Sequence, residues 1–201
     1  MSDVLVRRLN QIEAHITRPS FLAGKGLGNE IAVHIFEYDP QSELRVREHI
    51  KHMSLSIERK NSIQLLNLNM LNVVVDYLRH RNFYNRVLQL HSKKGDAGVI
   101  KALRAPMAAE RIRDFIASQY QPDQADLFLL HGVGSVWPLL RSHSLLNALH
   151  SVIGDTPLVL FYPGSFDDLS LTIFNQPGTG HSRGESRNYY RAFPLLKEPL
   201  P

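Results

Sequence analysis

Cysteine is absent from this 201-residue sequence. Its absence excludes a disulfide framework, a thiolate metal site and a cysteine nucleophile, and it fits a reducing compartment. Long hydrophobic runs are missing too: the longest, around "MLNVVVDYL" and "PLVLFYP", are far shorter than the ~20 residues of a membrane-spanning helix. Charged residues interrupt the first 19 positions, unlike the apolar centre of a signal peptide. We therefore expect a soluble cytoplasmic protein without membrane contact.

The sequence also lacks complete catalytic motifs. The segment 24–28, "GKGLG", has the glycines and lysine of a phosphate-binding loop, but that loop needs Ser or Thr after the lysine, a strand before it and a helix after it. Here Gly26 follows Lys25 and a strand follows the loop, so we interpret the glycines as a turn. Neither a G-x-S-x-G elbow nor an H-E-x-x-H zinc motif occurs. We therefore expect no catalytic residues, no metal and no cofactor.

Charge and hydrophobic content are both moderate. The hydrophobic share of 43% is enough for a full core, and the net charge is +4. A basic balance permits weak contact with DNA or with an acidic protein. The basic run 79–86, "RHRNFYNR", mixes arginines with aromatic residues, as nucleic-acid-binding segments do. We favour the simpler interpretation, an exposed helix end whose cations complement the helix dipole.

Apolar periodicity predicts alternating strands and helices. Helical spacing occurs near the N-terminus, after the Asp39-Pro40 helix start, near 70–80 and 84–93, after Pro106 and over 136–152. Strand-like runs occupy 31–38, 62–68, 126–132, 157–164, 169–174 and 189–195. This alternation predicts a single α/β domain, residues 1–201, with a mostly parallel, Rossmann-like sheet flanked by helices. We expect the last two strands to pair with each other as a short antiparallel C-terminal edge.

Glycines end two of the expected strands, and ligands bind at the carboxyl ends of strands in open α/β sheets. We therefore predict one crevice at the ends of 126–132 and 157–164. Its expected residues are Gly132, Gly134, Ser135, Arg141, His143, Gly164 and Asp167. An anion site at 132–135 and a tight turn both fit the glycines, and we favour the turn. A hydrolase or nuclease using His131, Asp167 or Asp168 is the weakest of the function hypotheses.

A surface for a partner protein is predicted from apolar residues that follow no helical or strand period. These residues are Phe21, Leu22 and Leu27, in and beside the glycine-rich segment. Lys25, Asn29 and Glu30 would form a polar rim around them. The alternative is that Phe21 and Leu22 pack onto their own domain.

Four segments in order resemble the BrxB family of BREX phage-defence systems. They are "GKGLGNEIAVHIFEYDPQSELRVREHI" (24–50), "DLFLLHGVGSVWPLLRSHSLLNAL" (126–149), "TPLVLFYPGSFDDLSLTIF" (156–174) and "NYYRAFPL" (188–195). The segment "PGTGHSRGESR" (177–187) is longer than the family pattern, so nothing is transferred to it.

The resemblance implies a component of an anti-phage system without an established enzymatic motif. Such a component would act as an adaptor between larger BREX proteins, most plausibly the phosphatase-like PglZ and the ATPase BrxC. The alternative is a nucleotide- or DNA-binding module within the same system.

Overall fold

A computed structural model describes residues 3–23, 33–60, 62–167, 170–175 and 192–196. Its helices are α1 (Asp3–Ile16), α2 (Pro19–Leu22), α3 (Glu43–Lys60), α4 (Met70–His80), α5 (Tyr84–Leu103), α6 (Ala109–Tyr120) and α7 (Ser142–Leu149). Short 3₁₀ helices are η1 (Pro40–Ser42), η2 (Pro122–Gln124) and η3 (Val133–Val136). The strands are β1 (Val33–Tyr38), β2 (Leu65–Asn69), β3 (Leu127–His131), β4 (Leu158–Phe166), β5 (Leu171–Ile173) and β6 (Ala192–Pro194).

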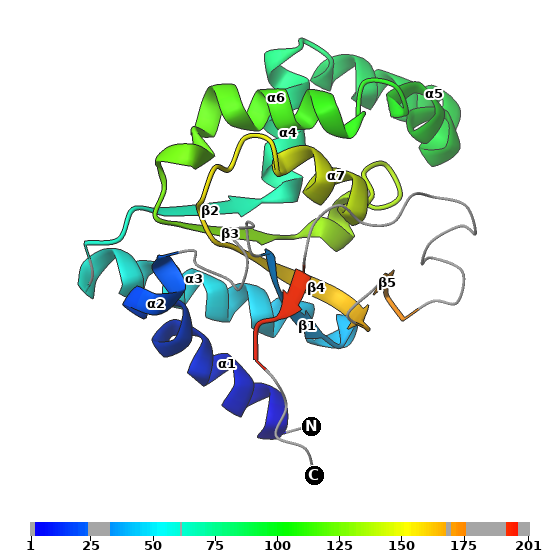
Figure 1. The fold of residues 1–201 in the computed structure, drawn as a ribbon. Coiled ribbons are helices and arrows are strands. Elements are labelled where there is room, and N and C mark those ends of the chain that lie inside the picture. The colour runs from blue at the N-terminus through cyan, green and yellow to red at the C-terminus, as the bar shows by residue number, and fades with distance from the viewer. Residues whose placement is uncertain (1–2, 24–32, 61, 168–169, 176–191, 197–201) are drawn as a thin grey trace.

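A mostly parallel sheet lies between two layers of helices, which confirms the predicted fold class (Figure 1). The strand order is β2-β3-β4-β1-β6, and every pair along this path is parallel. Helices α1 and α3 cover one face, while α4, α6 and α7 cover the other. Side chains alternate between these layers along β3: Leu127 and Leu129 face α1 and α3, whereas Phe128 and Leu130 face the other helices.

Capping residues begin η1, which leads into α3, and α4, which follows the edge strand β2. The Asp39 carboxylate accepts a hydrogen bond from the Gln41 N–H at 2.9 Å, at the predicted Asp-Pro start. Asn69 ends β2 and caps α4 at once, because its Oδ1 accepts from the Leu71 N–H at 3.0 Å. Strand and helix therefore meet without an intervening loop.

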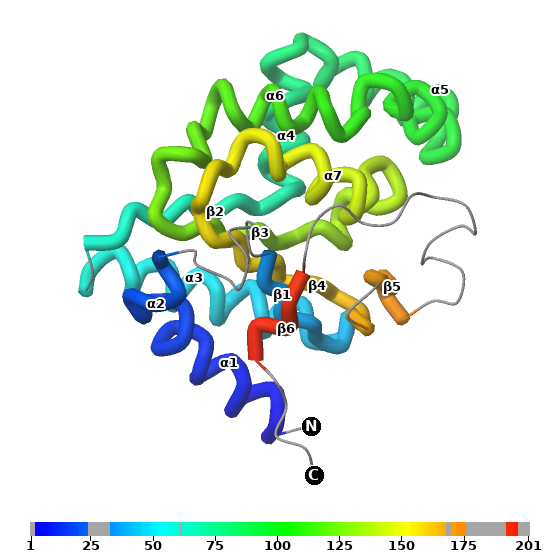
Figure 2. Tube along the Cα trace, viewed as in Figure 1, coloured from blue at the N-terminus to red at the C-terminus, as the bar shows by residue number. Residues whose placement is uncertain are grey.

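The predicted pairing of the last two strands with each other is wrong. Strand β5 is antiparallel to β4, with Gly164 opposite Ile173, whereas β6 is parallel to β1, with Val33 opposite Ala192. Figure 2 shows β6 beside β1 and β5 at the far end of β4. The short turn after β4 favours antiparallel return onto β4 itself, and β6 satisfies the backbone groups on the outer edge of β1.

Two helix predictions differ from the structure in extent. The segment 136–152 is not one helix, since η3 ends at Val136 and α7 begins at Ser142. Helix α5 extends beyond the predicted 84–93 as far as Leu103, but its backbone is not helical at Gly95, where φ is +61° and ψ is −167° and two helical segments meet at a kink. Glycine adopts this conformation without the steric penalty of a side chain.

Candidate functional site

A cavity of about 490 Å³ opens at the carboxyl ends of β2 and β3. Asn69 and His131 are the last residues of these strands and lie opposite each other in the parallel register. The cavity is lined by Leu44, Arg47, Glu48, Lys51, Asn67, Asn69, Asn72 and His131. We call this set the carboxyl-edge pocket. It joins α3 on one face of the sheet with the start of α4 on the other, in the position where open α/β sheets bind ligands.

Two buried polar atoms of the carboxyl-edge pocket have no hydrogen-bond partner. They are Asn67 Oδ1 and His131 Nδ1. The other amide atom of Asn67, Nδ2, donates to Ser54 Oγ at 2.9 Å, and the His131 residue is only 9% exposed. Because buried polar groups nearly always have partners, these two atoms mark a place where a bound group would complete the hydrogen bonding.

Electrostatics keep His131 neutral at physiological pH. Burial, together with the smaller effect of the positive charge of Arg47, lowers its pKa to about 4. Arg47 and Lys51 are one helical turn apart on α3 and therefore share a face. Neither forms an ion pair with any residue in the described ranges. The pocket thus presents two cations and a neutral imidazole, opposed by one carboxylate, Glu48.

Gly132 helps to position this pocket. Its φ is +71°, and a Cβ at this position would lie 2.8 Å from Asn69 Oδ1, the atom that caps α4. A side chain there would combine backbone strain with a clash against the cap. One residue of the predicted crevice, Gly132, therefore lies beside the carboxyl-edge pocket.

The other crevice glycines lie around the end of β5. A Cβ on Gly134 would lie 3.0 Å from both Pro163 and the Phe174 ring, and one on Gly164 would overlap the Thr172 carbonyl. These glycines accommodate close packing of the segment 172–174. Ser135 lies in η3, and Asp167 accepts hydrogen bonds from the Ser170 N–H at 2.6 Å and from its hydroxyl at 2.8 Å.

Arg141 and His143 lie at the N-terminal end of α7, where Arg141 is the capping position. Asp168 lies outside the described residues. A single crevice formed by all of the predicted residues stays a prediction.

The predicted partner surface falls mostly outside the described residues, which exclude Lys25, Leu27, Asn29 and Glu30. Phe21 and Leu22 are half-buried and pack against the α1–α3 core. The Phe21 ring lies 4.5 Å from the ring of His34, so its contacts match the alternative in which it packs onto its own domain. Whether the remaining residues bind a partner stays a prediction.

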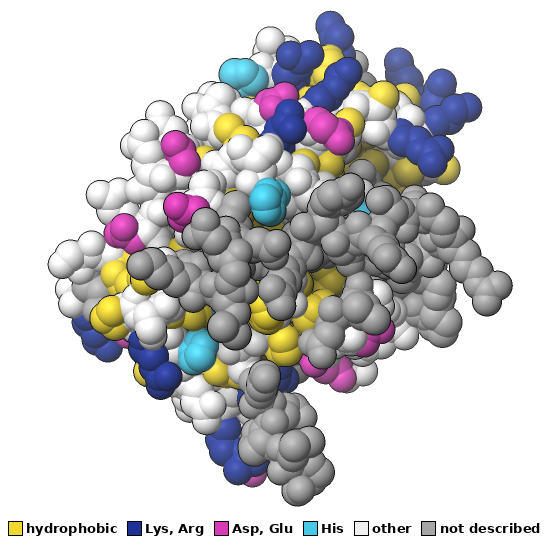
Figure 3. Space-filling view, viewed as in Figure 1, with side chains coloured by type: hydrophobic (Ala, Val, Ile, Leu, Met, Phe, Trp, Pro, Cys, Tyr) yellow, Lys and Arg dark blue, Asp and Glu magenta, His cyan; other side chains and the backbone are white. Residues whose placement is uncertain are grey.

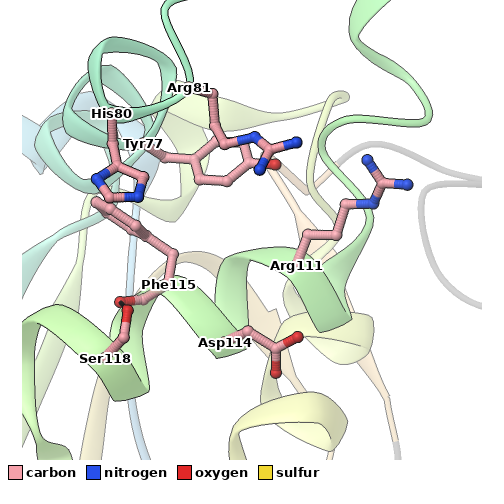
Figure 4. A pocket seen from close by; sticks show the side chains of 7 residues that line it. All are labelled: Tyr77, His80, Arg81, Arg111, Asp114, Phe115 and Ser118. Carbon is pink, nitrogen blue, oxygen red and sulfur yellow. Dashed lines mark hydrogen bonds between the residues drawn. The ribbon is translucent and has the colours of Figure 1, made fainter.

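A second cavity, of about 410 Å³, lies between α4 and α6 (Figure 4). Three of its polar side chains already have partners within the chain. The Tyr77 hydroxyl donates to the Pro106 carbonyl at 3.0 Å, and Asp114 pairs with Arg113 at 2.7 Å. Ser118 donates its hydroxyl hydrogen bond to a backbone carbonyl of its own helix. The carboxyl-edge pocket, with its unpartnered atoms, is therefore the stronger candidate for a ligand.

Sequence reasoning missed most of the carboxyl-edge pocket. The available signal was "NLNMLN" (67–72), in which Asn67 and Asn69 are amides in an otherwise apolar strand and Asn72 follows in the next helix. Arg47 and Lys51 carry no such signal, because charged residues are expected on any amphipathic helix.

Membrane and metal features can be assessed only for the described residues. Among these, no helix has both the length and the apolar character needed to cross a bilayer. Nor do the same residues bring together three or more His, Cys, Asp or Glu side chains that could hold a metal ion.

Comparison with known proteins places the chain in a family. The model of the family described as BREX protein BrxB matches residues 66–195. The chain belongs to the BrxB family. A BREX protein BrxB from Escherichia coli O9:H4 (strain HS) is 38% identical over 201 residues, covering 100% of this chain and 96% of that protein. Another, from Bacillus cereus (strain H3081.97), is 36% identical over 193 residues, covering 94% and 96%.

Membership in the BrxB family makes this chain a component of a BREX system, with other BREX proteins as its partners. The matched region includes the middle of the chain, which contributed little to the resemblance at the level of short motifs. No solved structure matches the chain.

Proposed function

We propose that this BrxB-family chain is a non-catalytic component of anti-phage defence that connects larger BREX proteins, with PglZ and BrxC as the expected partners. The observation that carries the proposal is helix α5. It has 20 residues in two helical segments, which meet at a kink at Gly95, and it buries only Leu103. Isolated helices as short as these segments are marginal in water, so exposed ones are unusual unless they have another surface to contact.

The exposed side of α5 has the composition of a protein interface. Leu88 is 52% exposed and Ile100 is 39% exposed. Arg86, Lys93, Lys94 and Lys101 lie along the same helix. Lys and Arg side chains gather at the end of the molecule where α5 lies (Figure 3). Apolar groups with a charged surround favour association with an acidic protein surface.

The test is co-purification of the full chain with PglZ and with BrxC. We expect a Leu88→Asp/Ile100→Asp variant to lose at least one partner while its melting temperature stays near that of the wild type. The matched control is Leu55→Asp, because Leu55 on α3 is also exposed, at 41%. Full retention of both partners by the α5 variant would contradict the proposed role of α5.

The alternative function, DNA binding, is favoured by the basic excess of α5, which has four cations and one carboxylate, Asp96. Binding to phosphates weakens steeply as salt rises, because counterions are released. Retention of duplex DNA at low salt that is lost in a Lys93→Glu/Lys94→Glu variant would support this alternative. Partner loss in the Leu88→Asp/Ile100→Asp variant without loss of DNA retention would favour the adaptor role.

A further inference from the structure

We propose that the carboxyl-edge pocket binds the phosphate group of a small organic phosphate, such as a nucleoside monophosphate. The pocket is made by α3, β2, β3 and the start of α4, whereas the proposed partner surface is α5. The proposed binding site therefore goes beyond the adaptor function, and each proposal can be tested independently of the other.

Charge is the first argument for an oxyanion. Arg47 and Lys51 face the cavity from one side of α3, and neither has an ion-pair partner in the described part of the chain. Guanidinium groups bind phosphate through paired hydrogen bonds, and ammonium groups bind it as point charges. Glu48 lowers the net charge of the lining to a single positive charge, which is enough to attract an anion.

Unfilled hydrogen bonding is the second, independent argument. His131 is nine-tenths buried and lines the cavity, and its Nδ1 has no partner. Asn67 Oδ1 is likewise a buried atom without a hydrogen-bond partner. A neutral imidazole can donate or accept, and an amide oxygen accepts from a hydroxyl, so these atoms suit a phosphate ester that also carries hydroxyl groups.

The size of the cavity favours a phosphate ester over a bare phosphate ion. A cavity of about 490 Å³ falls within the range of small-molecule sites and has space beyond a phosphate group. Leu44, which is 76% exposed at the rim, offers an apolar contact to the organic part. Asn69 and Asn72 at the start of α4 face the cavity where a helix dipole favours negative charge.

Titration of the isotope-labelled full chain by NMR tests the site, with inorganic phosphate and AMP as separate probes. We expect saturable shifts of the side-chain amides of Asn67, Asn69 and Asn72 and of the His131 ring, with AMP bound more tightly. Equal affinity for both probes would overturn the claim of an organic phosphate. If neither probe saturates the shifts at about 10 mM, the affinity is too weak for a functional site of this class. That result would overturn the site itself.

Variants on α3 localise the binding. Arg47→Gln should weaken AMP binding on the order of tenfold, because a charge-assisted hydrogen bond is lost. Glu48→Gln should leave binding unchanged or tighter, since it removes a like charge. Arg45→Gln is the matched control: the residue is an exposed cation on the same helix that does not line the cavity. Equal weakening by Arg45→Gln and Arg47→Gln would show diffuse surface attraction and overturn the proposal.

A DNA duplex that shifts the same signals at lower concentration than AMP would also overturn the proposal, in favour of nucleic acid. Loss of folding does not obscure these outcomes, because the wild-type titration alone decides whether the site exists. Partner binding by Arg47→Gln is measured alongside. Its retention together with lost AMP binding would leave the adaptor proposal intact.

Discussion

Helices α3 and α5 are of similar length but are stabilised in different ways. Helix α3 has 18 residues and buries Val46, Ile50, Met53, Ser54 and Ile57, whereas α5 has 20 residues and buries only Leu103. The packing of α3 on the sheet fixes the backbone that carries the exposed residues Arg47 and Lys51 beside the carboxyl-edge pocket. Helix α5 presents its apolar and basic side chains to solvent. A fixed helix suits a small-molecule site, and a lightly packed one suits contact with another protein.

Side-chain truncation should produce the largest difference between α3 and α5 in the free energy of unfolding. Ile50→Ala on α3 should lower the free energy of unfolding by about 2–5 kcal/mol, because Ile50 is 1% exposed and its removal leaves a cavity in the core. Leu88→Ala on α5 should change it by less than about 0.5 kcal/mol. Urea denaturation measures both. Similar losses from the two variants would mean that α5 is packed as firmly as α3.

Acid should destabilise the fold through two histidines of the sheet, His34 and His131, rather than through α5. Burial lowers the pKa of His131 to about 4, and burial followed by the charge of His15 lowers that of His34 to about 4. Both histidines stay neutral in the folded chain but take up protons when unfolded, below the ordinary pKa of 6.5. Stability is therefore fully present above about pH 6.5 and declines between there and about pH 4.

The loss from each histidine should be on the order of 2–3 kcal/mol at pH 4. Urea denaturation at pH 7.5, 6 and 4.5 follows it. A His131→Gln variant should show a shallower decline than the wild type over this range. A wild-type stability that stays flat from pH 7 to pH 4.5 would exclude this contribution of the buried histidines.

The same comparison explains what the sequence could predict. Periodicity identified the α3 face through Val46 and Ile50, because a regular apolar stripe reports burial directly. The glycines that follow β3 and lie in β4 pointed to the carboxyl edge of the sheet, where the carboxyl-edge pocket lies. The pairing of β6 with β1 was missed, since which strands become neighbours depends on tertiary packing. The first segment of α5 does end near Gly95, as glycine favours, whereas the second helical segment, which continues to Leu103, was missed.

The candidate site was only partly predictable for a related reason. His131 and Gly132 were noticed from their place after a strand, but Arg47 and Lys51 enter the pocket from a helix about 80 residues earlier in the chain. Only the crossover of α3 beneath the sheet brings them together with Asn69.

That residues 1–201 form one domain stays a prediction.

Two glycines with positive φ but different surroundings sharpen the comparison further. Gly132 has φ +71° and ψ 18° and would place a Cβ 2.8 Å from Asn69 Oδ1, whereas Gly95 in α5 has φ +61° and ψ −167° and nothing within 4 Å. Gly95→Ala should therefore cost only the penalty for this glycine-favouring backbone conformation, about 1–3 kcal/mol. Gly132→Ala should cost the left-handed penalty of about 1–2 kcal/mol and about 1 kcal/mol in addition, because the α4 cap must also move. A loss for Gly132→Ala no larger than the left-handed penalty, measured by urea denaturation, would show that the cap adjusts freely.

The smallest effect is expected for the ion pair that bridges the kink of α5. His91 Nε2 and Asp96 Oδ1 are 2.9 Å apart, but their side chains are 60% and 87% exposed. Solvent screens such a pair, and holding both side chains in place costs conformational entropy. Asp96→Asn should therefore change the free energy of unfolding by less than about 0.5 kcal/mol. Native-state hydrogen exchange of the amides of α5 gives the sharper measurement, because it detects local opening of this helix alone. Faster exchange throughout α5 in Asp96→Asn, with α3 unchanged, would mean that the pair stabilises the exposed helix more than its solvent exposure implies.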